Sequence, residues 1–370
     1  MQPTAPRFKY FSVFVFTVGN TSRVTADMSI IKHSKYGYFI SHKALIDEIY
    51  STVDTPETSF QLKPQLFNIA APYKPPKSKH KKTKNPDDPF ESEVRHVETI
   101  FQNLSAELED HFTKTDFEVR NTEALDTATA LYDESGNNLT TDLHGANPDA
   151  PTSKIIENRA FLFPHNCKFY SRDVKDMSLY LKEKFDLILL DPPWWNKYIR
   201  RKRKHTDHGY NMMYNEDLKN LPLENHLNHD GLIVVWCTNS AQHLSALRDE
   251  IFPKWGVSYL GKWYWVKVTQ MGVPICEFAE PPRKQPFEQI VFGGRGSEGL
   301  LPCDKVVISV PSALHSHKPP LIRLLEPFLP DNPTCLEVFA RYLLPNWTSY
   351  GNEVLRFQHE SLYTKVSKFI

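Results

Sequence analysis

The chain of 370 residues has few cysteines, no net charge and no long uninterrupted hydrophobic run. Its five cysteines are scattered and none stands in a Cys-x-x-Cys spacing, which argues against a structural zinc site and a disulfide scaffold. We therefore expect a reducing compartment. The apolar stretch at residues 10–18 is too short to cross a membrane and lacks a small-residue cleavage signature, so it predicts a strand.

The zero net charge hides an uneven distribution of charge along the chain. The tract Lys74–Lys84 contains six lysines, two prolines and no acid, whereas residues 87–150 carry a large acidic excess. A lysine tract of this kind is typical of a disordered linker, and some such tracts are nuclear import signals or tethers for nucleic acid. These two interpretations are compatible, and both stay open.

We predict four segments. They are an N-terminal α+β extension or small domain at 1–73, a basic linker at 74–86, a helix followed by an acidic flexible segment at 87–150, and a large domain at 151–370. No motif in the first 150 residues assigns them a role.

Two helices are expected before the large domain. One lies within residues 41–53. The other begins at Pro89, with Asp88 as N-cap and Glu91 as its reciprocal partner, because proline favours the first helical position. Apolar residues then recur at helical spacing and predict core packing: Val94, Val97, Ile100, Leu104, Leu108 and Phe112. The stretch 121–151 has weak periodicity and predicts a long loop or flexible insert.

From about residue 154 the chain alternates between apolar strand-like runs and helical pieces. The strand-like runs cover 185–191, 231–238, 262–268, 288–294, 305–311, 334–340 and 352–358, and the helical pieces cover 177–184, 240–251 and 319–329. Apolar strands alternating with helices indicate an α/β sheet covered on both faces. Ligands bind beyond the carboxyl ends of the strands in such sheets, and Asp191 lies at one such end.

The sequence Asp191-Pro192-Pro193-Trp194 supplies parts suited to methylating the exocyclic amine of adenine. The lone pair of that nitrogen is delocalised into the ring, so the amine is a poor nucleophile. A carboxylate and a backbone carbonyl that accept its two hydrogens would orient the amine and stabilise the transition state. Prolines hold the carbonyls rigidly, and a flat aromatic ring offers the base a stacking face. The alternative is an ordinary strand end with a proline turn and a core tryptophan.

Three later segments, together with this motif, resemble the adenine-N6 methyltransferases of the eukaryotic type, which include the messenger-RNA N6-methyladenosine writer. "LHSHKPP" (314–320) resembles the family's His-Ser-x-Lys-Pro segment, "LEVFAR" (336–341) its Glu-x-Phe-x-Arg strand end, and "NWTSYGNEVL" (346–355) its Trp-x-x-x-Gly-Asn segment. They occur in the family's order over roughly 155–358. The branch called methyltransferase-like four is the most similar.

The resemblance implies a Rossmann-like doubly wound methyltransferase domain that uses S-adenosylmethionine and needs no metal. It assigns the cofactor adenine to Asp173 and Val174, the cofactor carboxylate to Lys318, and the ribose to Arg341, Asn352 and Glu353. Asp191 would accept from the cofactor amine as well as from the substrate, and would act with Pro192, Pro193 and Trp194. His315 and His317 form a weak metal pair, and we interpret them as structural or as residues of the cofactor rim.

Positive charge follows the motif closely. Such a run is normally a solvated loop, but one leaving the catalytic turn could neutralise the phosphates of a nucleic acid. Trp195 stands where many relatives have an acid, and it could stack on a flanking nucleotide or fill the core. We therefore predict substrate contacts for Trp195, Lys197, Arg200, Arg201, Lys202, Arg203 and Lys204.

One further motif resembles a dinucleotide-binding fingerprint but stands in the wrong context. Residues 294–299 read Gly-x-Gly-x-x-Gly, but a proline turn and a strand follow rather than the helix that a dinucleotide-binding fingerprint requires. We expect a surface loop at this position.

The leading hypothesis is an adenine-N6 methyltransferase acting on nucleic acid. The branch resemblance favours RNA, especially 2′-O-methyladenosine in a small nuclear RNA, with DNA adenine as the alternative. A catalytically inactive RNA-binding scaffold is the hypothesis of a different class. We expect a nuclear protein, with some in the cytoplasm, that has no membrane association. Activity as a monomer is one hypothesis, and the need for a partner subunit stays open.

Overall fold

The computed structural model describes residues 29–73, 89–108, 110–112, 121–136, 142–195, 212–280, 283–296 and 301–367. The strand predicted at 10–18 and the lysine tract Lys74–Lys84 lie outside the described residues. None of the helices in the described ranges combines the length and the apolar composition needed to cross a membrane.

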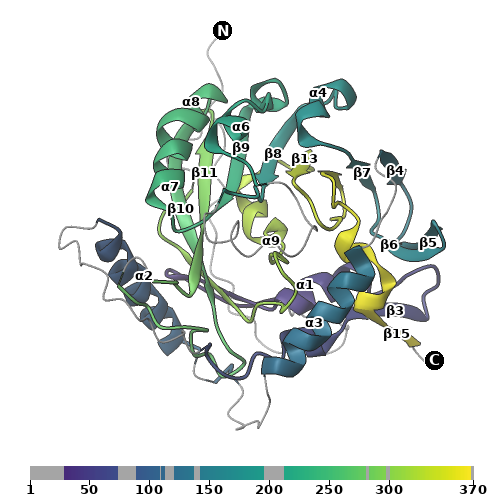
Figure 1. The fold of residues 1–370 in the computed structure, drawn as a ribbon, viewed down its shortest axis with the longest axis horizontal. Helices are drawn as coiled ribbons and strands as arrows, with labels where there is room; N and C mark the ends of the chain where they lie inside the picture. Colours follow the sequence, from purple (N-terminus) through teal and green to yellow (C-terminus); the bar gives the residue numbers. More distant parts are fainter. Residues whose placement is uncertain are drawn as a thin grey trace, which may run out of the picture.

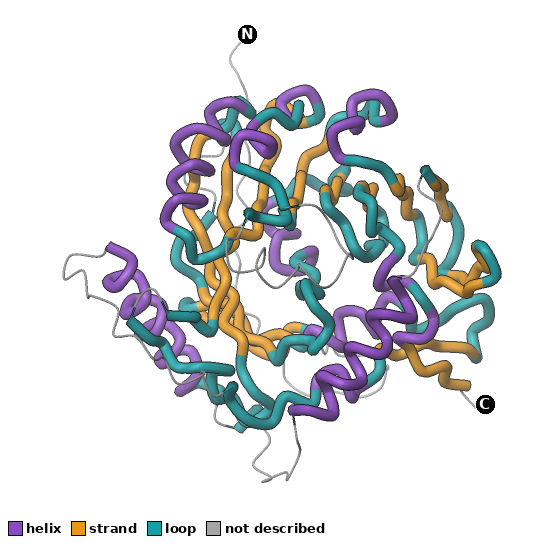
Figure 2. Tube along the Cα trace, viewed as in Figure 1, coloured by secondary structure: helices purple, strands orange, loops and turns teal. Residues whose placement is uncertain are grey.

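A single eleven-stranded sheet organises the described part of the chain. Across the sheet the strands run β1 (Ile30–Ser34), β2 (Gly37–Ile40), β12 (Val306–Ser309), β10 (Ser258–Lys267), β11 (Phe287–Gly294), β9 (Leu227–Cys237), β8 (Phe185–Leu190), β13 (Cys335–Val338), β14 (Trp347–Tyr350), β7 (Cys167–Ser171) and β4 (Leu143–Asn147). Figure 2 shows these strands arranged in an arc from β10 and β11 round to β7 and β4.

Most of the sheet points in one direction. Strands β9, β8, β13, β14 and β7 pair in parallel, as do β10, β12 and β2, while β11 runs antiparallel to both β9 and β10. The carboxyl ends of the parallel strands and the first residues of β11 therefore share one edge of the sheet. Ligands bind along this edge in open α/β sheets, so it is the first place to look for a site.

Both faces of the sheet are covered, because successive side chains of a strand point to opposite sides. In β8, Leu187 and Leu189 join the core on one face, whereas Ile188 and Leu190 join the core on the other. The outer core includes residues of α4 (Met177–Tyr180), α6 (Asn215–Lys219), α7 (Ala241–Ala246), a π-helical turn (Leu247–Ile251) and α8 (Phe252–Lys254). Figure 1 shows α7 and α8 outside the arc of strands and α9 (Ile322–Leu325) within it.

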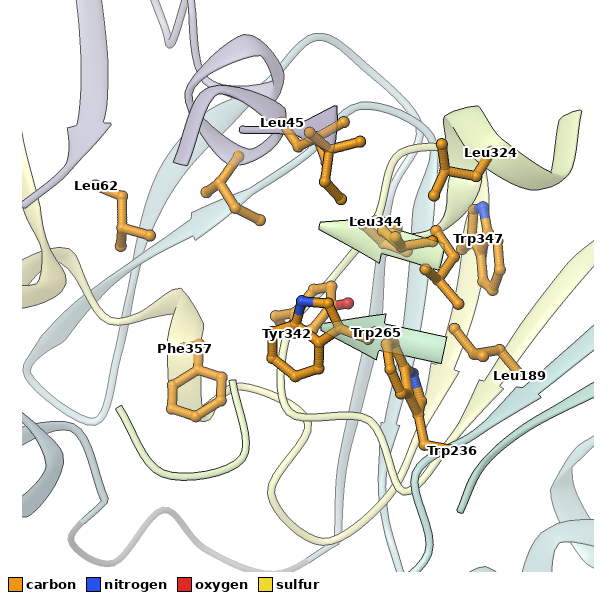
Figure 3. Close-up of a cluster of buried hydrophobic side chains, with 14 of the residues drawn as sticks. Leu45, Leu62, Leu189, Trp236, Trp265, Leu324, Tyr342, Leu344, Trp347 and Phe357 are labelled. Atoms are coloured by element: carbon orange, nitrogen blue, oxygen red, sulfur yellow. The ribbon is translucent and has the colours of Figure 1, made fainter. Parts of the chain in front are cut away.

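The inner core is rich in large aromatic side chains. Trp236 of β9 and Trp265 of β10 meet edge to face with ring centroids 5.5 Å apart, close to Tyr342 and Leu189 (Figure 3). The same core takes in α1 (His42–Ile49), which begins after Ser41, whose hydroxyl accepts a hydrogen bond from Ala44 N–H at 3.1 Å. The predicted helix within 41–53 is confirmed.

Helix α2 (Pro89–Ala106) covers the outer face of the other half of the sheet. It begins at Pro89 as expected, while the proposed cap Asp88 lies outside the described residues. The predicted apolar stripe is confirmed as core packing: Val94, Val97, Leu104 and Leu108 are buried, and Ile100 and Phe112 pack against them. These side chains meet β2, β10 and β12.

Smaller elements complete the fold. Two antiparallel pairs lie beside the main sheet, β3 (Thr58–Leu62) with β15 (Tyr363–Ser367) and β5 (Thr152–Ile156) with β6 (Arg159–Phe163). Short 3-10 turns occupy Pro64–Phe67, Val174–Asp176, Leu223–Asn225, Glu326–Phe328, Arg356–Gln358 and Glu360–Leu362.

The structure corrects two sequence-based expectations. The stretch interpreted as a loop or flexible insert contains α3 (Asn121–Gly136) and β4. Burial of Ala124, Ala128 and Leu131 against the rest of the protein holds this weakly amphipathic helix. The stretch 352–358 is a pair of turns rather than a strand; the strand of that region is β14, just before it.

The N-terminal segment is joined directly to the large domain. Strand β2 pairs with β12 in parallel, so residues 29–40 extend the main sheet instead of forming a sheet of their own. Gly37 makes this contact possible. Its φ is +148°, and a Cβ atom there would lie 1.9 Å from the carbonyl oxygen of Val306.

We predict that Gly37→Ala lowers the free energy of unfolding by more than about 3 kcal/mol, because backbone strain adds to an overlap with a strand that cannot yield. Gly296→Ala is the matched control. It also has a positive φ, but the nearest atom to its Cβ is a side-chain oxygen at 3.5 Å, so the cost should be about 1–2 kcal/mol. Denaturant unfolding measures both, and equal losses would show that β2 does not dock tightly on β12.

Candidate active site

Several charged side chains gather at the edge where the parallel strands end. Asp191 follows β8, Arg341 follows β13 and Glu353 follows β14. Lys318 lies in the connection after β12. Four residues predicted from separate motifs are thus brought together, although the chain between the first and the last of them exceeds 150 residues.

Asp191 lies between two cations. Its Oδ1 is 3.3 Å from the Lys318 ammonium, and its Oδ2 accepts a hydrogen bond from Arg341 Nη1 at 3.1 Å. All three side chains are at most 13% exposed. An ion pair screened from water keeps more of its Coulomb energy than one at the surface, so this carboxylate is firmly oriented.

The pairing continues on both sides of Asp191. Arg341 Nε donates to Glu353 at 2.9 Å, and Arg356 donates to the other oxygen of Glu353 at 2.5 Å. Lys318 also donates to Glu288 at 2.8 Å, and Lys267 pairs with the second oxygen of Glu288. Positive and negative groups therefore alternate along one chain of contacts: Lys267, Glu288, Lys318, Asp191, Arg341, Glu353 and Arg356.

The electrostatics of Glu288 follow from this arrangement. Burial alone would raise its pKa, but Lys267 and Lys318 outweigh burial and hold the pKa well below its ordinary value. Burial lowers the pKa of Lys318 less than Asp191 and Glu288 raise it. Both groups are therefore charged at neutral pH, which keeps the alternation intact.

Glu337 is the exception within the cluster. It is the third residue of β13 and is 5% exposed, and its Oε2 is buried without a hydrogen-bond partner in the structure. Burial and the neighbouring charge of Asp191 raise its pKa to about 8, against a smaller opposing effect of Arg341. Glu337 is thus mostly protonated at pH 7.

The turn after β8 is held by the backbone. Pro192 O accepts from Trp194 N–H at 2.8 Å, and Pro193 O accepts from Met213 N–H at 2.9 Å. A carbonyl oxygen has two lone pairs, so each can accept a further hydrogen bond. These two contacts fix where the carbonyls point, in addition to the restriction that the proline rings impose.

Trp194 does not present a free stacking face. It is 7% exposed, its indole N–H donates to Trp236 O at 2.8 Å, and its ring packs against His243 with centroids 4.9 Å apart. The ring belongs to the outer core, because its apolar area is buried among the helices of that face. Trp194 therefore anchors the turn, and its ring would have to be uncovered before it could take the stacking role that the sequence predicts.

Trp195 is half-buried and does not fill the core. Its ring stacks on that of Tyr214, which is exposed, with centroids 5.8 Å apart and an interplanar angle of 20°. The cations predicted to contact the substrate, Lys197, Arg200, Arg201, Lys202, Arg203 and Lys204, lie outside the described residues.

The residues predicted to hold the cofactor adenine and ribose sit at the same edge. Asp173 follows β7 and is exposed; its side chain accepts from Lys175 N–H at 3.0 Å at the start of a 3-10 turn. Val174 is buried in the outer core. Asn352 is exposed, and its backbone carbonyl lies 3.5 Å from Ser171 Oγ.

His317 is part of the interior rather than a ligand. It packs against His42, Tyr342 and Phe357, and burial lowers its pKa to about 3, so its imidazole is neutral. His315 is exposed and contacts Ser316 and Tyr132. In the ranges that the structure describes, no group of three or more His, Cys, Asp or Glu side chains is placed to hold a metal ion.

Four charged residues of the cluster were not singled out from the sequence: Lys267, Glu288, Glu337 and Arg356. Glu337 stands inside the "LEVFAR" motif, which was a usable signal. Glu288 carried none, because its place depends on the antiparallel direction of β11. Lys267 is the last residue of β10 and carried no motif. Arg356 lay in a stretch interpreted as a strand.

The mostly parallel α/β sheet, with charged residues gathered at the carboxyl ends of its strands, is consistent with a Rossmann-like methyltransferase fold. Comparison with a family model and with known proteins shows what this chain is similar to. Residues 185–353 match the MT-A70 family model.

Three relatives illustrate the similarity. The N(6)-adenine-specific methyltransferase METTL4 of Mus musculus is 36% identical over 237 residues, which cover 56% of this chain and 48% of the relative. The DNA N6-methyl methyltransferase of Caenorhabditis elegans is 37% identical over 220 residues, covering 57% and 58%. The N6-methyladenosine RNA methyltransferase MTA1 of Cryphonectria parasitica is 38% identical over 186 residues, covering 49% and 55%. The chain spans about half the length of these curated relatives.

Glu337 leads to a prediction about pH. Its pKa is raised in the folded protein from an ordinary value of 4.5 to about 8, so its contribution to stability is complete below pH 4.5 and is lost as pH rises towards 8. Glu337→Gln stays neutral and has no such loss. We predict that, relative to this variant, the wild type loses free energy of unfolding as pH increases from about 5 to 8, with a plateau above that range.

Urea unfolding of both proteins between pH 5 and 9 measures the difference directly. A constant difference across this range would show that Glu337 has an ordinary pKa and is not confined beside Asp191.

Proposed function

We propose that this chain is an S-adenosylmethionine-dependent methyltransferase that modifies the N6 amine of adenine in a nucleic acid. The observation that carries the proposal is the oriented carboxylate of Asp191, fixed between Lys318 and Arg341 at the start of a rigid proline turn. The MT-A70 match and the names of the relatives support the reaction class.

The side chains at the edge fit S-adenosylmethionine as a chemical match of donors and acceptors. Lys318 would hold its carboxylate, Asp191 its amine, and Glu353 with Arg341 its ribose hydroxyls. Asp173, an exposed acceptor after β7, would hold the cofactor adenine, as the family resemblance implies. The unpartnered Oε2 of Glu337 is a further buried polar atom in this cluster, which a bound polar group could satisfy. S-adenosylmethionine supplies a methyl group activated on a sulfonium.

The protein's own contribution is positioning. Asp191 and a carbonyl of Pro192 or Pro193 accept the two hydrogens of the adenine amine, which aims its lone pair at the incoming methyl group. Because Asp191 is already oriented by two cations, little reorganisation is needed when positive charge develops on the nitrogen. Stabilisation aimed at developing charge is commonly a large term in catalysis.

RNA is the proposed polymer. The similarity to the methyltransferase-like four branch favours 2′-O-methyladenosine in a small nuclear RNA as the target, and it favours the nucleus, with some protein in the cytoplasm, as the location. The lysine tract Lys74–Lys84 is compatible with nuclear import. We propose that the chain needs no membrane and no metal, and that it acts as a monomer.

DNA adenine is the second candidate, and the specific observation in its favour is the 37% identity to a DNA N6-methyl methyltransferase. Matched RNA and DNA oligonucleotides, together with an RNA that carries 2′-O-methyladenosine at the target, separate the two. We expect the highest kcat/KM for the 2′-O-methylated RNA. Preference for DNA would replace RNA as the proposed polymer.

An inactive RNA-binding scaffold belongs to a different functional class. The intact turn from Asp191 to Trp194 and the buried pairing of Lys318 argue against it, because a scaffold has no need of an oriented carboxylate. Titration calorimetry with S-adenosylmethionine in the presence of RNA is decisive, since a wild-type protein that binds no cofactor cannot be the proposed enzyme.

Asp191→Ala should lower kcat by about a hundredfold to a thousandfold, a loss typical of removing one preorganised polar group. The fold should persist, because Lys318 keeps Glu288 as partner and Arg341 keeps Glu353. Asp230→Ala, an exposed acid at the start of the buried part of β9, is the control and should behave as wild type. Full activity of Asp191→Ala would contradict the mechanism.

Neutralising the basic run beside the site should weaken binding of nucleic acid across sequences. We predict that replacing Lys197 and the five cations at 200–204 by glutamine raises Kd and flattens the dependence of log Kd on log salt, because fewer phosphates are neutralised. Lys182→Gln with Lys184→Gln, before β8 at the far edge, is the control. Fluorescence anisotropy at several salt concentrations measures both, and an unchanged slope would rule out phosphate contact by this run.

A further inference from the structure

Trp195, four residues after Asp191, forms an open aromatic pair with Tyr214. Trp195 and Tyr214 stack with centroids 5.8 Å apart and an interplanar angle of 20°. Tyr214 is 57% exposed, and Trp195 is half-buried. Leaving a tyrosine ring this exposed forgoes the stabilisation that burial of its apolar area would give.

Backbone contacts hold the pair in place. Trp195 N–H donates to Met213 O at 2.9 Å, and Tyr214 N–H donates to Asp217 at 3.2 Å, which ties Tyr214 to the start of α6. The two rings therefore rest on separate segments that are joined to each other. A platform built this way is preorganised, so a planar group can bind to it at a small cost in conformational entropy.

His243 of α7 contacts both segments that carry the two rings. Its Nε2 is 3.0 Å from Trp195 O, its Nδ1 is 2.7 Å from Asn215, and its ring packs against Trp194. Burial lowers the pKa of His243, so the imidazole is neutral and carries one N–H. Both contact atoms are oxygens, Trp195 O and Asn215 Oδ1, whereas a neutral imidazole has one N–H to donate. With that hydrogen on Nε2, His243 donates to Trp195 O, and rotating the Asn215 amide by 180° would let its NH2 group donate to Nδ1.

The position of the pair relates it to the active site. Trp195 directly follows the turn that begins at Asp191, and Met213 donates to Pro193 O, one of the candidate acceptors for the substrate amine. The platform and the turn are thus one hydrogen-bonded unit. A polymer whose adenine reached Asp191 would bring a neighbouring nucleotide towards the two rings.

We propose that Trp195 and Tyr214 form a stacking platform for the nucleobase next to the target adenine, an inference that rests on the proposed function. Every base has a π face, so the platform favours a single-stranded or unstacked segment without reading its sequence. It gives the half-buried Trp195 a role outside the core. His243 is a positioning residue for this platform.

Direct binding tests the platform apart from methyl transfer. Anisotropy with a labelled single-stranded RNA of about ten nucleotides should give a Kd about five- to a hundredfold higher for Trp195→Ala and for Tyr214→Ala, because one stacked base contributes about 1–3 kcal/mol. Tyr214→Phe keeps the ring and should bind as wild type. Tyr259→Ala is the control, since this partly exposed tyrosine lies near the start of β10, at the edge of the sheet opposite the site.

Kinetics identify which nucleotide stacks. The alanine variants should raise KM for an oligonucleotide substrate while leaving KM for a lone adenosine nucleotide unchanged, because the lone nucleotide has no neighbour to bind. If KM rises equally for both substrates, the rings bind the target base itself, and the proposal is wrong. Binding of S-adenosylmethionine should be the same in all variants.

His243 provides a readout that a merely structural role would not move. His243→Ala should raise oligonucleotide KM with little change in kcat, and His243→Gln, whose amide can donate to Trp195 O and accept from Asn215, should restore much of the loss.

If instead the alanine variants of the two rings bind RNA as wild type and lose self-association on size-exclusion chromatography, the rings are a protein contact and the proposal is wrong. Failure of the wild type to methylate any nucleic acid would overturn the proposed function, while the binding data would still decide the platform.

Discussion

The carboxylate of Asp191, held between Lys318 and Arg341, is the interaction on which the site depends. Removing three charged groups from water is costly, and their mutual attraction offsets that cost only when each has well-placed partners. Here each cation contacts a second carboxylate, so the charges alternate across the edge of the sheet from Lys267 to Arg356. The result is a polar cluster that can be rigid before any ligand arrives.

The direction of the strands makes this cluster possible. Parallel strands deliver the ends of β8, β13 and β14 to one edge, and the connection after β12 brings Lys318 to it. The antiparallel β11 delivers its beginning to that edge, which places Glu288 beside Lys318. The inner aromatic core borders the cluster on one side, where the Lys318 ammonium lies 5.4 Å from the centroid of the Trp236 ring. The direction of each strand therefore decides which charged residues reach the site.

Much of the sheet could be predicted because strand stretches buried on both faces are apolar, as at 187–190 in β8 and 232–237 in β9. The stretch 352–358 misled because its buried Val354 and Leu355 give the same apolar signal within turns. Helix α3 was missed because its sequence is only weakly amphipathic, and its position depends on tertiary packing. It contacts the site through Tyr132, whose ring lies 3.4 Å from the Arg356 guanidinium. The Asp-Pro-Pro-Trp motif selected Asp191, and the family resemblance selected Lys318, Arg341 and Glu353. Placing Glu288 required knowledge of the direction of β11.

The most direct test of the account is the fate of a labelled methyl group. Wild-type protein is incubated with methyl-labelled S-adenosylmethionine and an oligonucleotide that contains a single adenine, and the digested nucleosides are analysed by mass spectrometry. The account predicts that the label appears on N6 of that adenine, because Asp191 and the proline turn are arranged for an exocyclic amine. A label at another atom, or no transfer although the cofactor binds, would contradict it.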